Sequence, residues 1–256
     1  MQDTQAGYVR SETHKGITTI EFFHPQSNSM PRRILEHLAN EIHASGADVD
    51  TAVVVLRSGG NGAFCAGASF DELAQLEDEK RGFDFFSGFA NVINAMRKCP
   101  KLIIGRIHGK CVGGGVGLAA AADYAIAHEN ADIKLSELAV GIGPFVVGPA
   151  IERKIGTSAF SQLAIDAGMW RNGDWARRKG LYAELHPTLE GMDESVARLA
   201  NQLSHASPEA MKELKKIIWK DTDNWDELLS TRAEISGRLV TSAFAKEAIA
   251  KIQSSR

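Results

Sequence analysis

The sequence has few of the features that mark secreted, membrane-spanning or disulfide-bonded proteins. Its 256 residues include three cysteines, an odd number without the spacing of a metal site or a redox pair. Such cysteine usage is typical of a reducing cytoplasm. No apolar run reaches the length that spans a membrane, and the polar start of the chain has no signal-peptide core. We therefore expect a cytoplasmic protein that has no membrane partner.

Charge and motifs exclude two further classes of function. The net charge is -3 and no basic stripe is present, so the sequence gives no reason to expect a nucleic-acid partner. The nucleotide-binding pattern G-x-x-x-x-G-K-[ST] is missing, and no dinucleotide fingerprint opens an N-terminal βαβ unit. We expect neither a metal nor a resident cofactor. The chain is long enough to form a sizeable hydrophobic core. We expect its partner to be a small molecule.

The most informative stretch is rich in glycine and runs over residues 103–127. A short β-type apolar run leads into it through a turn. Four glycines follow: Gly113, Gly114, Gly115 and Gly117. This order predicts a strand, a turn with positive φ or close backbone approach, and the start of a tightly packed helix. Unpaired N–H groups at such a corner bind anions or oxyanions well. A tight turn with close helix packing and no ligand is the alternative.

The rest of the chain reads as an α/β protein that ends in helices. Strands are expected over 8–23, 51–57 and 124–128, with a short one within 131–138, and helices over 31–44 and 88–96. A second glycine-containing corner lies at 58–73, so a unit of strand, glycine corner and helix occurs at least twice. Later helices are expected over 150–155, 159–167, 174–179, 192–204, 208–219 and 226–252.

A change of composition near 183–187 divides the chain into two regions. We expect an α/β core over residues 1–185, which carries the site, and a helical region over 186–256.

Four segments of the chain form a set by their order and separation. Phe64 to Ala68 reads F-C-A-G-A, and Gly113 to Gly115 reads G-G-G before an alanine-rich helix. Glu137 lies in L-S-E-L-A-V-G-I-G-P, and residues 206–215 read A-S-P-E-A-M-K-E-L-K. Together these segments resemble the crotonase family, also called the enoyl-CoA hydratase/isomerase family. The resemblance extends over about residues 20–252.

The resemblance implies a crotonase-like spiral of repeated ββα units followed by helices that assemble a homotrimer, or a hexamer of two trimers. It implies an acyl-CoA thioester as the substrate, so that coenzyme A enters with the substrate and is not a cofactor. It also implies that the N–H groups of Ala68 and Gly114 form an oxyanion hole. The remaining substrate-binding positions are Ala66, Gly67, Gly113, Gly115 and Gly117.

The chemistry of thioesters agrees with this arrangement. Negative charge develops on the thioester oxygen when a proton leaves the α-carbon, and two preorganised donors stabilise the resulting enolate. The loss of one donor typically costs about 10²-fold in rate or more.

One departure from the family pattern decides the predicted reaction. Hydratases of the family carry a second glutamate in the segment after G-G-G, and Gly117 stands at that position. Glu137 is then the single acid/base candidate, and one carboxylate suffices to move a proton between two carbons of an enolate. We therefore predict double-bond isomerisation of an enoyl-CoA. Apolar neighbours of Glu137, Leu135, Leu138 and Val140, are expected to raise its pKa.

Several alternatives remain open from the sequence. Within the family they are a hydratase with a non-standard second residue, a hydrolase or decarboxylase, and a catalytically inactive acyl-CoA binder. Glu137 itself has the alternative of a surface glutamate in a salt bridge. Asp71 replaces the lysine with which many members contact the CoA phosphate, so a carrier-protein thioester is also an alternative.

Other residues carry weaker predictions. Four cations on helical segments are candidates for the CoA phosphates, with a solvated helix face as the alternative: Arg32, Arg33, Lys212 and Lys216. Four aromatic residues either cover the acyl pocket or belong to the core: Phe83, Phe85, Phe86 and Phe89. His108 and His24 lie beside turns, and Cys65 and Cys111 read as small buried hydrophobes.

Overall fold

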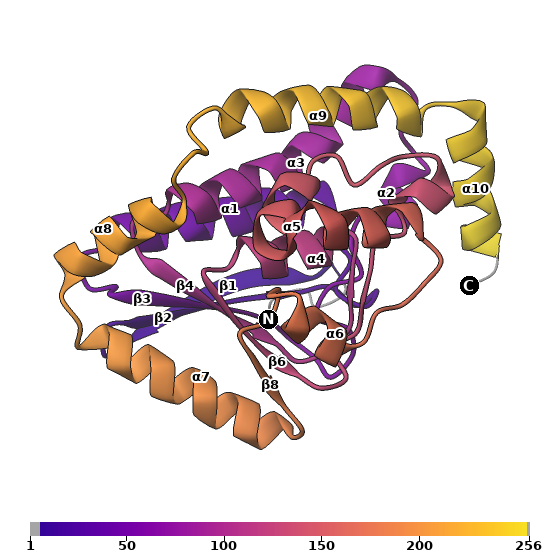
Figure 1. The fold of residues 1–256 in the computed structure, drawn as a ribbon. Coiled ribbons are helices and arrows are strands. Elements are labelled where there is room, and N and C mark those ends of the chain that lie inside the picture. The colour runs from indigo at the N-terminus through magenta and orange to yellow at the C-terminus, as the bar shows by residue number, and fades with distance from the viewer. Residues whose placement is uncertain (1–5, 255–256) are drawn as a thin grey trace.

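A six-stranded sheet lies at the centre of the computed structural model, which describes residues 6–254 (Figure 1). Its strand order is β1-β2-β3-β4-β6-β8. The bounds are β1 Tyr8–His14, β2 Ile17–Phe23, β3 Val53–Ser58, β4 Leu102–Ile107, β6 Tyr124–His128 and β8 Glu184–His186. β1 and β2 pair antiparallel, and the other neighbours are parallel. A second, two-stranded parallel sheet pairs β5 (Cys111–Val112) with β7 (Ile133–Lys134).

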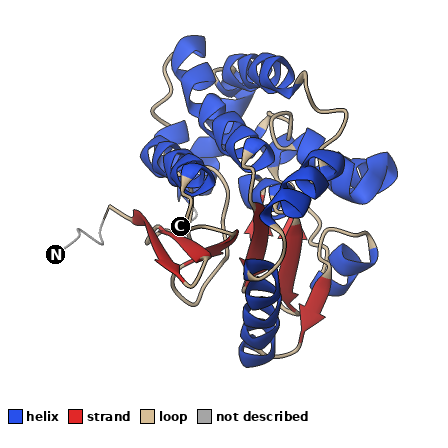
Figure 2. Ribbon diagram, turned by 90° about the vertical axis from the view of Figure 1, so that its left-hand side faces the viewer, coloured by secondary structure: helices blue, strands red, loops and turns tan. Residues whose placement is uncertain are grey.

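Helices cover both faces of the large sheet. Figure 1 shows α1, α3, α4, α5 and α9 on one side and α7 on the other, and Figure 2 shows α7 beside the strands. The helices are α1 Arg32–Ala47, α2 Phe70–Leu73, α3 Glu79–Lys98, α4 Gly114–Ala121, α5 Gly148–Ile165, α6 Gly173–Arg178, α7 Leu189–Ser204, α8 Pro208–Ile218, α9 Trp225–Val240 and α10 Ala243–Ser254, with the 3-10 helix η1 Glu137–Val140. Within residues 6–254, none of them combines the length and apolar character needed to cross a membrane.

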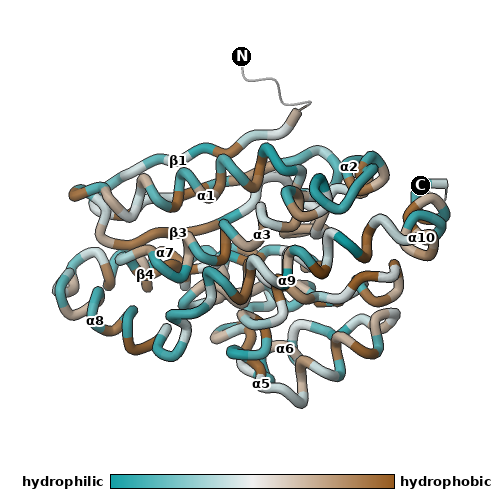
Figure 3. Tube along the Cα trace, turned by 90° about the horizontal axis from the view of Figure 1, so that it is seen from above, coloured by the Kyte–Doolittle hydropathy of each residue, from teal (hydrophilic) through white to brown (hydrophobic). Residues whose placement is uncertain are grey.

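The burial of β3 shows why the sheet needs helices on both faces. Val54 and Leu56 belong to the main core, whereas Val53 and Val55 pack against α7. A parallel strand that is buried on both faces reads as a continuous apolar run, and β3 appears as one in the hydropathy view of Figure 3. The buried strand predicted over 51–57 is therefore confirmed.

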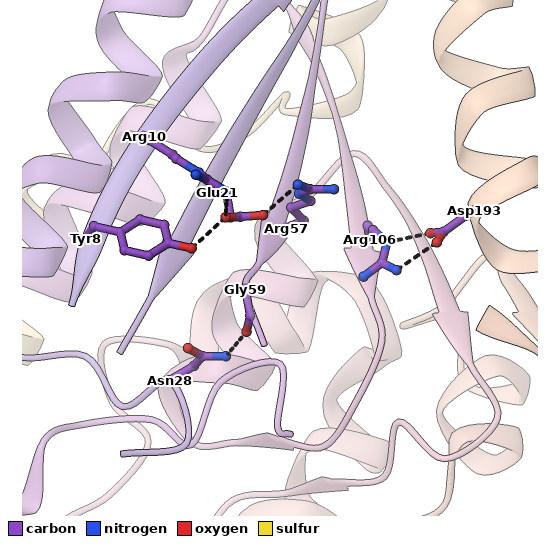
Figure 4. A network of polar contacts seen from close by, with 8 residues as sticks. All are labelled: Tyr8, Arg10, Glu21, Asn28, Arg57, Gly59, Arg106 and Asp193. Atoms are coloured by element: carbon purple, nitrogen blue, oxygen red, sulfur yellow. Dashed lines mark hydrogen bonds and ion pairs between the residues drawn. The ribbon is translucent and has the colours of Figure 1, made fainter. Parts of the chain in front are cut away.

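A network of polar side chains connects β1, β2 and β3 (Figure 4). The register places Arg10, Glu21 and Arg57 side by side, and both arginines pair with Glu21 at 2.6 Å. The hydroxyl of Tyr8 donates to the same carboxylate at 2.7 Å. Burial alone raises the pKa of Glu21, but Tyr8 and the two arginines outweigh it and hold this pKa below its ordinary value. The network thus stabilises a carboxylate on the face of the sheet that α7 covers.

Two helical predictions need correction. The helix predicted over 226–252 is two helices, because Ser242 accepts a hydrogen bond from Ala245 N and starts α10 anew. The segments predicted over 150–155 and 159–167 both lie in α5, and Gly156, with φ of 74° and ψ of 159°, breaks the helix between them, so this division is confirmed. The helix predicted over 88–96 is much longer and begins at Glu79. The two repeats of strand, glycine corner and helix are as predicted.

The crossing of α3 and α9 depends on a pair of glycines. A Cβ added to Gly82 would lie 2.6 Å from the carbonyl oxygen of Gly237, and one added to Gly237 would lie 2.9 Å from the carbonyl carbon of Gly82. Both distances are to backbone, which cannot move without moving a helix. The close approach brings α9 over the segment of α3 that leads to the site.

We predict that Gly237→Ala lowers the free energy of unfolding by about 1–3 kcal/mol through overpacking against α3. The melting temperature should fall by several degrees. Gly168→Ala is the matched control, because a Cβ at Gly168 meets no atom within 4 Å. Equal melting temperatures of the two variants, measured by circular dichroism, would contradict this account of the crossing.

Candidate active site

Two glycine corners meet backbone to backbone at the carboxyl ends of β3 and β5. Cys65, in the loop after β3, forms a parallel bridge with Cys111, and Val112 N donates to Cys65 O at 2.9 Å. A Cβ added to Gly115 would lie 2.9 Å from the Cβ of Cys65. Glycine at this position therefore allows α4 to begin directly against the loop.

The N–H groups of Ala68 and Gly114 lie free at this junction. Neither has a hydrogen-bond acceptor among residues 6–254, and Gly114 is the first residue of α4. Gly67 has φ of 83°, and a Cβ on it would lie 3.4 Å from Gly114 N. The positive end of the α4 dipole adds to the attraction for negative charge. The assignment of these two groups as oxyanion donors remains a prediction, which this geometry supports.

Asn28 holds the first corner in place and was not predicted as part of the site. Its side-chain amide donates to Gly59 O and Ala63 O, both at 2.9 Å, and the first of these bonds is drawn in Figure 4. Its side-chain oxygen accepts from His24 N at 2.8 Å. Asn28 has φ of 55°, a conformation that asparagine tolerates better than most residues. An asparagine in the turn after β2 was the available signal in the sequence.

Glu137 lies against the second corner. The sequence places it in a short strand within 131–138, but β7 ends at Lys134 and Glu137 begins η1. A Cβ added to Gly113 would lie 2.7 Å from Oε1 of Glu137, so the carboxyl occupies the space that glycine leaves open. Gly113 has φ of 52° and directly precedes Gly114, the candidate donor. The acid/base candidate and the oxyanion candidate are thus neighbours.

The carboxyl of Glu137 is buried although the residue as a whole is partly exposed. Oε2 is shielded from solvent and has no hydrogen-bond partner among the described residues. Burial raises the pKa of Glu137 from 4.5 to about 7, and backbone hydrogen bonds from Glu137 and Ser136 offset only part of this rise. The expected direction is confirmed. Of the three apolar neighbours expected to cause the shift, Leu135 and Val140 are buried, whereas Leu138 is 52% exposed.

A mainly apolar cavity, partly open to solvent, joins these groups. Its walls include the site candidates Ala66, Gly67, Ala68, Gly113, Gly114 and Glu137. The other lining residues are Phe70, Leu73, Phe86, Phe89, Val112, Ser136, Val140, Ile142, Gly143, Pro144, Phe145, Val146, Val147 and Ser236. Among these described residues, Glu137 is the only titratable one. Gly115 and Gly117 do not line the cavity and act through packing.

Some of the aromatic candidates from the sequence line the cavity, whereas the cationic candidates do not. Phe86 and Phe89 line the cavity as predicted, whereas Phe83 and Phe85 pack in the core. Of the four cations considered for CoA, none lines the cavity: Arg32 pairs with Glu36 and Lys216 with Glu213.

The buried histidine and cysteines lie outside the cavity. Burial raises the pKa of the Cys65 thiol to about 12, and burial with the nearby Arg106 lowers the pKa of His108 to about 4. Both side chains are therefore uncharged at neutral pH, which agrees with structural roles.

Glu137 makes the stability of the protein depend on pH. Its pKa is higher in the folded state than in the unfolded state, so the folded state binds more protons between about pH 4.5 and pH 7. Stability contributed by this group therefore falls as the pH rises through that window.

We predict that Glu137→Gln raises the free energy of unfolding at pH 8, by at most about 3 kcal/mol, because no charge is then buried. At pH 5 the difference from wild type should shrink to less than about 1 kcal/mol. Denaturant unfolding at both pH values measures it. A difference that does not change between pH 5 and pH 8 would contradict the burial of an ionisable carboxyl.

The chain is similar to known proteins over nearly its whole length. The enoyl-CoA hydratase/isomerase family model matches residues 12–254. The chain is 25% identical over 208 residues to the (7aS)-7a-methyl-1,5-dioxo-2,3,5,6,7,7a-hexahydro-1H-indene-carboxyl-CoA hydrolase of Mycobacterium tuberculosis, covering 79% of this chain and 80% of that protein. It is 26% identical over 218 residues to the mitochondrial Delta(3,5)-Delta(2,4)-dienoyl-CoA isomerase of Pongo abelii, covering 80% and 66%.

A solved structure shows the same fold. The enoyl-CoA hydratase from Bacillus halodurans superimposes with a TM-score of 0.87 at 20% identity, covering 95% of this chain and 99% of that one. The predicted crotonase-like α/β fold with a helical C-terminal region is therefore confirmed. By its family model, its fold and the position of its motifs, this chain belongs to the enoyl-CoA hydratase/isomerase family of acyl-CoA enzymes.

Proposed function

We propose that this protein isomerises the double bond of an unsaturated acyl-CoA thioester. In this proposal the N–H groups of Ala68 and Gly114 bind the thioester oxygen, and Glu137 moves the proton. One observation carries the proposal: of the described residues around the cavity, Glu137 alone is titratable, and its carboxyl lies directly beside the oxyanion corner. One base with two donors is the full requirement of a proton shift along an enolate.

The reaction balances without any other reactant. Glu137, as the carboxylate, takes a proton from C2 of a 3-enoyl thioester, and the electrons form an extended enolate whose oxygen lies at the two N–H donors. The protonated Glu137 then returns the proton to C4, and the double bond comes to lie between C2 and C3. A carboxyl with a pKa of about 7 is both a competent base and a competent acid near neutral pH.

Hydration and hydrolysis are less well supported by this cavity. Both reactions consume a water, and hydration also needs a second proton-transfer group besides Glu137. Ser136 and Ser236 are the other polar side chains on the walls, and the hydroxyl of Ser236 already donates to Arg232 O at 3.1 Å. The cavity also has no cation on its described walls, which favours an uncharged, apolar acyl group.

A neighbouring hollow suggests where the phosphate-bearing part of coenzyme A lies. It shares Ser136 and Val140 with the acyl cavity, and its walls carry two lysines, Lys134 and Lys251, and one carboxylate, Glu247. These two lysines would supply the positive charge that Asp71 cannot supply.

Assembly as a homotrimer or a hexamer of two trimers is also proposed. Two large apolar side chains lie exposed at the end of α5 and just after it, Ile165 and Met169. Exposed apolar side chains of this kind are suited to an interface between subunits.

We predict that the purified protein converts 3-enoyl-CoA to 2-enoyl-CoA without a gain in mass. Glu137→Gln should lower the rate by at least about 10²-fold, because the only base is lost. Liquid chromatography with mass detection, using standards for double-bond position, resolves the products. The exposed Glu129 gives a matched control, and Glu129→Gln should keep the wild-type rate within about twofold. Addition of water to 2-enoyl-CoA by wild type would contradict the isomerase proposal.

We also predict that kcat/KM for this isomerisation rises with pH and reaches half its plateau near pH 7, because the carboxylate of free Glu137 is the reactive form. Below this value the rate should fall about tenfold per pH unit. Initial rates between pH 5.5 and pH 8 test it, and a flat profile across that range would refute a base with a raised pKa.

A further inference from the structure

Gly117 and Val147 share one space between α4 and the cavity. Gly117 lies on the first turn of α4, three residues after the donor Gly114, and a Cβ added to it would lie 2.7 Å from both Cβ and Cγ1 of Val147. Val147 is only 5% exposed, lines the acyl cavity and is the residue before α5. A side chain at 117 and the present side chain at 147 therefore exclude each other.

We infer that Val147 determines the specificity of this site by filling the volume where a carboxylate at position 117 would stand. The inference rests on the proposed function and goes beyond it, because it assigns the choice between proton shift and water addition to one packing contact. Glycine at position 117 therefore has two effects. It removes a carboxylate, and it leaves the space that the isopropyl group of Val147 fills.

Water addition shows what the closed wall prevents. Hydration of a 2-enoyl thioester forms a bond from the water oxygen to C3, transfers one water proton to a base, and places a proton on C2. Glu137 serves one of these proton transfers, so a second group must serve the other. At the wall beside Gly117 the cavity offers apolar carbon from Val147 and its neighbours Phe145 and Val146. A water there has no base and few polar partners.

The contact also dictates which variants are informative. The substitution Val147→Ala would not make room for a side chain at position 117. The Cβ of residue 147, which alanine keeps, is itself one of the two atoms at 2.7 Å. The pair must therefore be exchanged as Gly117→Glu with Val147→Gly. The neighbouring Val146 is 4% exposed and lines the same cavity, so Gly117→Glu with Val146→Gly is the matched control.

The experiment compares wild type, Gly117→Glu, Val147→Gly, the exchanged pair and the control pair. Each protein is assayed with 3-enoyl-CoA for isomerisation and with 2-enoyl-CoA for water addition. The melting temperature of each protein is also measured. We expect Gly117→Glu alone to lower the melting temperature by about 5 °C through overpacking, and Val147→Gly to restore part of that loss. The exchanged pair should hydrate 2-enoyl-CoA at least about 10²-fold faster than wild type, and the control pair should not.

The outcomes separate this inference from the proposed function. If wild type isomerises but the exchanged pair folds and gains no hydration, Val147 does not set the specificity and the inference is overturned while the proposed function stands. A gain of hydration by Gly117→Glu alone, without a lower melting temperature, overturns it equally. If wild type does not isomerise, the proposed function is overturned, and the inference falls with it.

Discussion

The candidate site depends on one carboxyl group that is held away from water and against a glycine. Glu137 begins a 3-10 helix, and its oxygen lies where any side chain on Gly113 would have to be. Because no cation pairs with the buried Oε2 among the described residues, the cost of desolvation appears as a raised pKa. The same step of backbone, from Gly113 to Gly114, brings an unpaired N–H group to the cavity. The proposed acid/base group and the proposed oxyanion donor are therefore positioned by one corner.

The surrounding fold keeps this corner rigid. The loop after β3 pairs with β5 through Cys65 and Cys111, and Asn28 fastens the same loop through Gly59 and Ala63. On the far side, α9 crosses α3 at Gly82 and Gly237, which places Ser236 and Phe86 on the cavity walls. Contacts that are distant in sequence thus define a small apolar space around a single charge.

Much of this arrangement was predictable from the sequence, and the limits have physical causes. The glycine corners were visible because few other residues allow positive φ or such close backbone contact, and the motif order indicated the family. The 3-10 conformation of Glu137 was not, because a four-residue element has no clear periodicity. Val147 and Asn28 were missed as well, since their roles arise from contacts with residues about 30 positions away or more. Local sequence pattern indicates the secondary structure of a segment, but not its tertiary contacts.

The central claim is that one carboxyl carries the proton between two carbons of the substrate. A 3-enoyl-CoA labelled with two deuterium atoms at C2 tests it in ordinary water, with mass spectrometry and NMR of the product at early turnover. The account predicts that a measurable part of the label arrives at C4, because the protonated Glu137 is shielded from solvent until it returns the atom. Product whose C4 hydrogen comes entirely from solvent at the earliest times would contradict it.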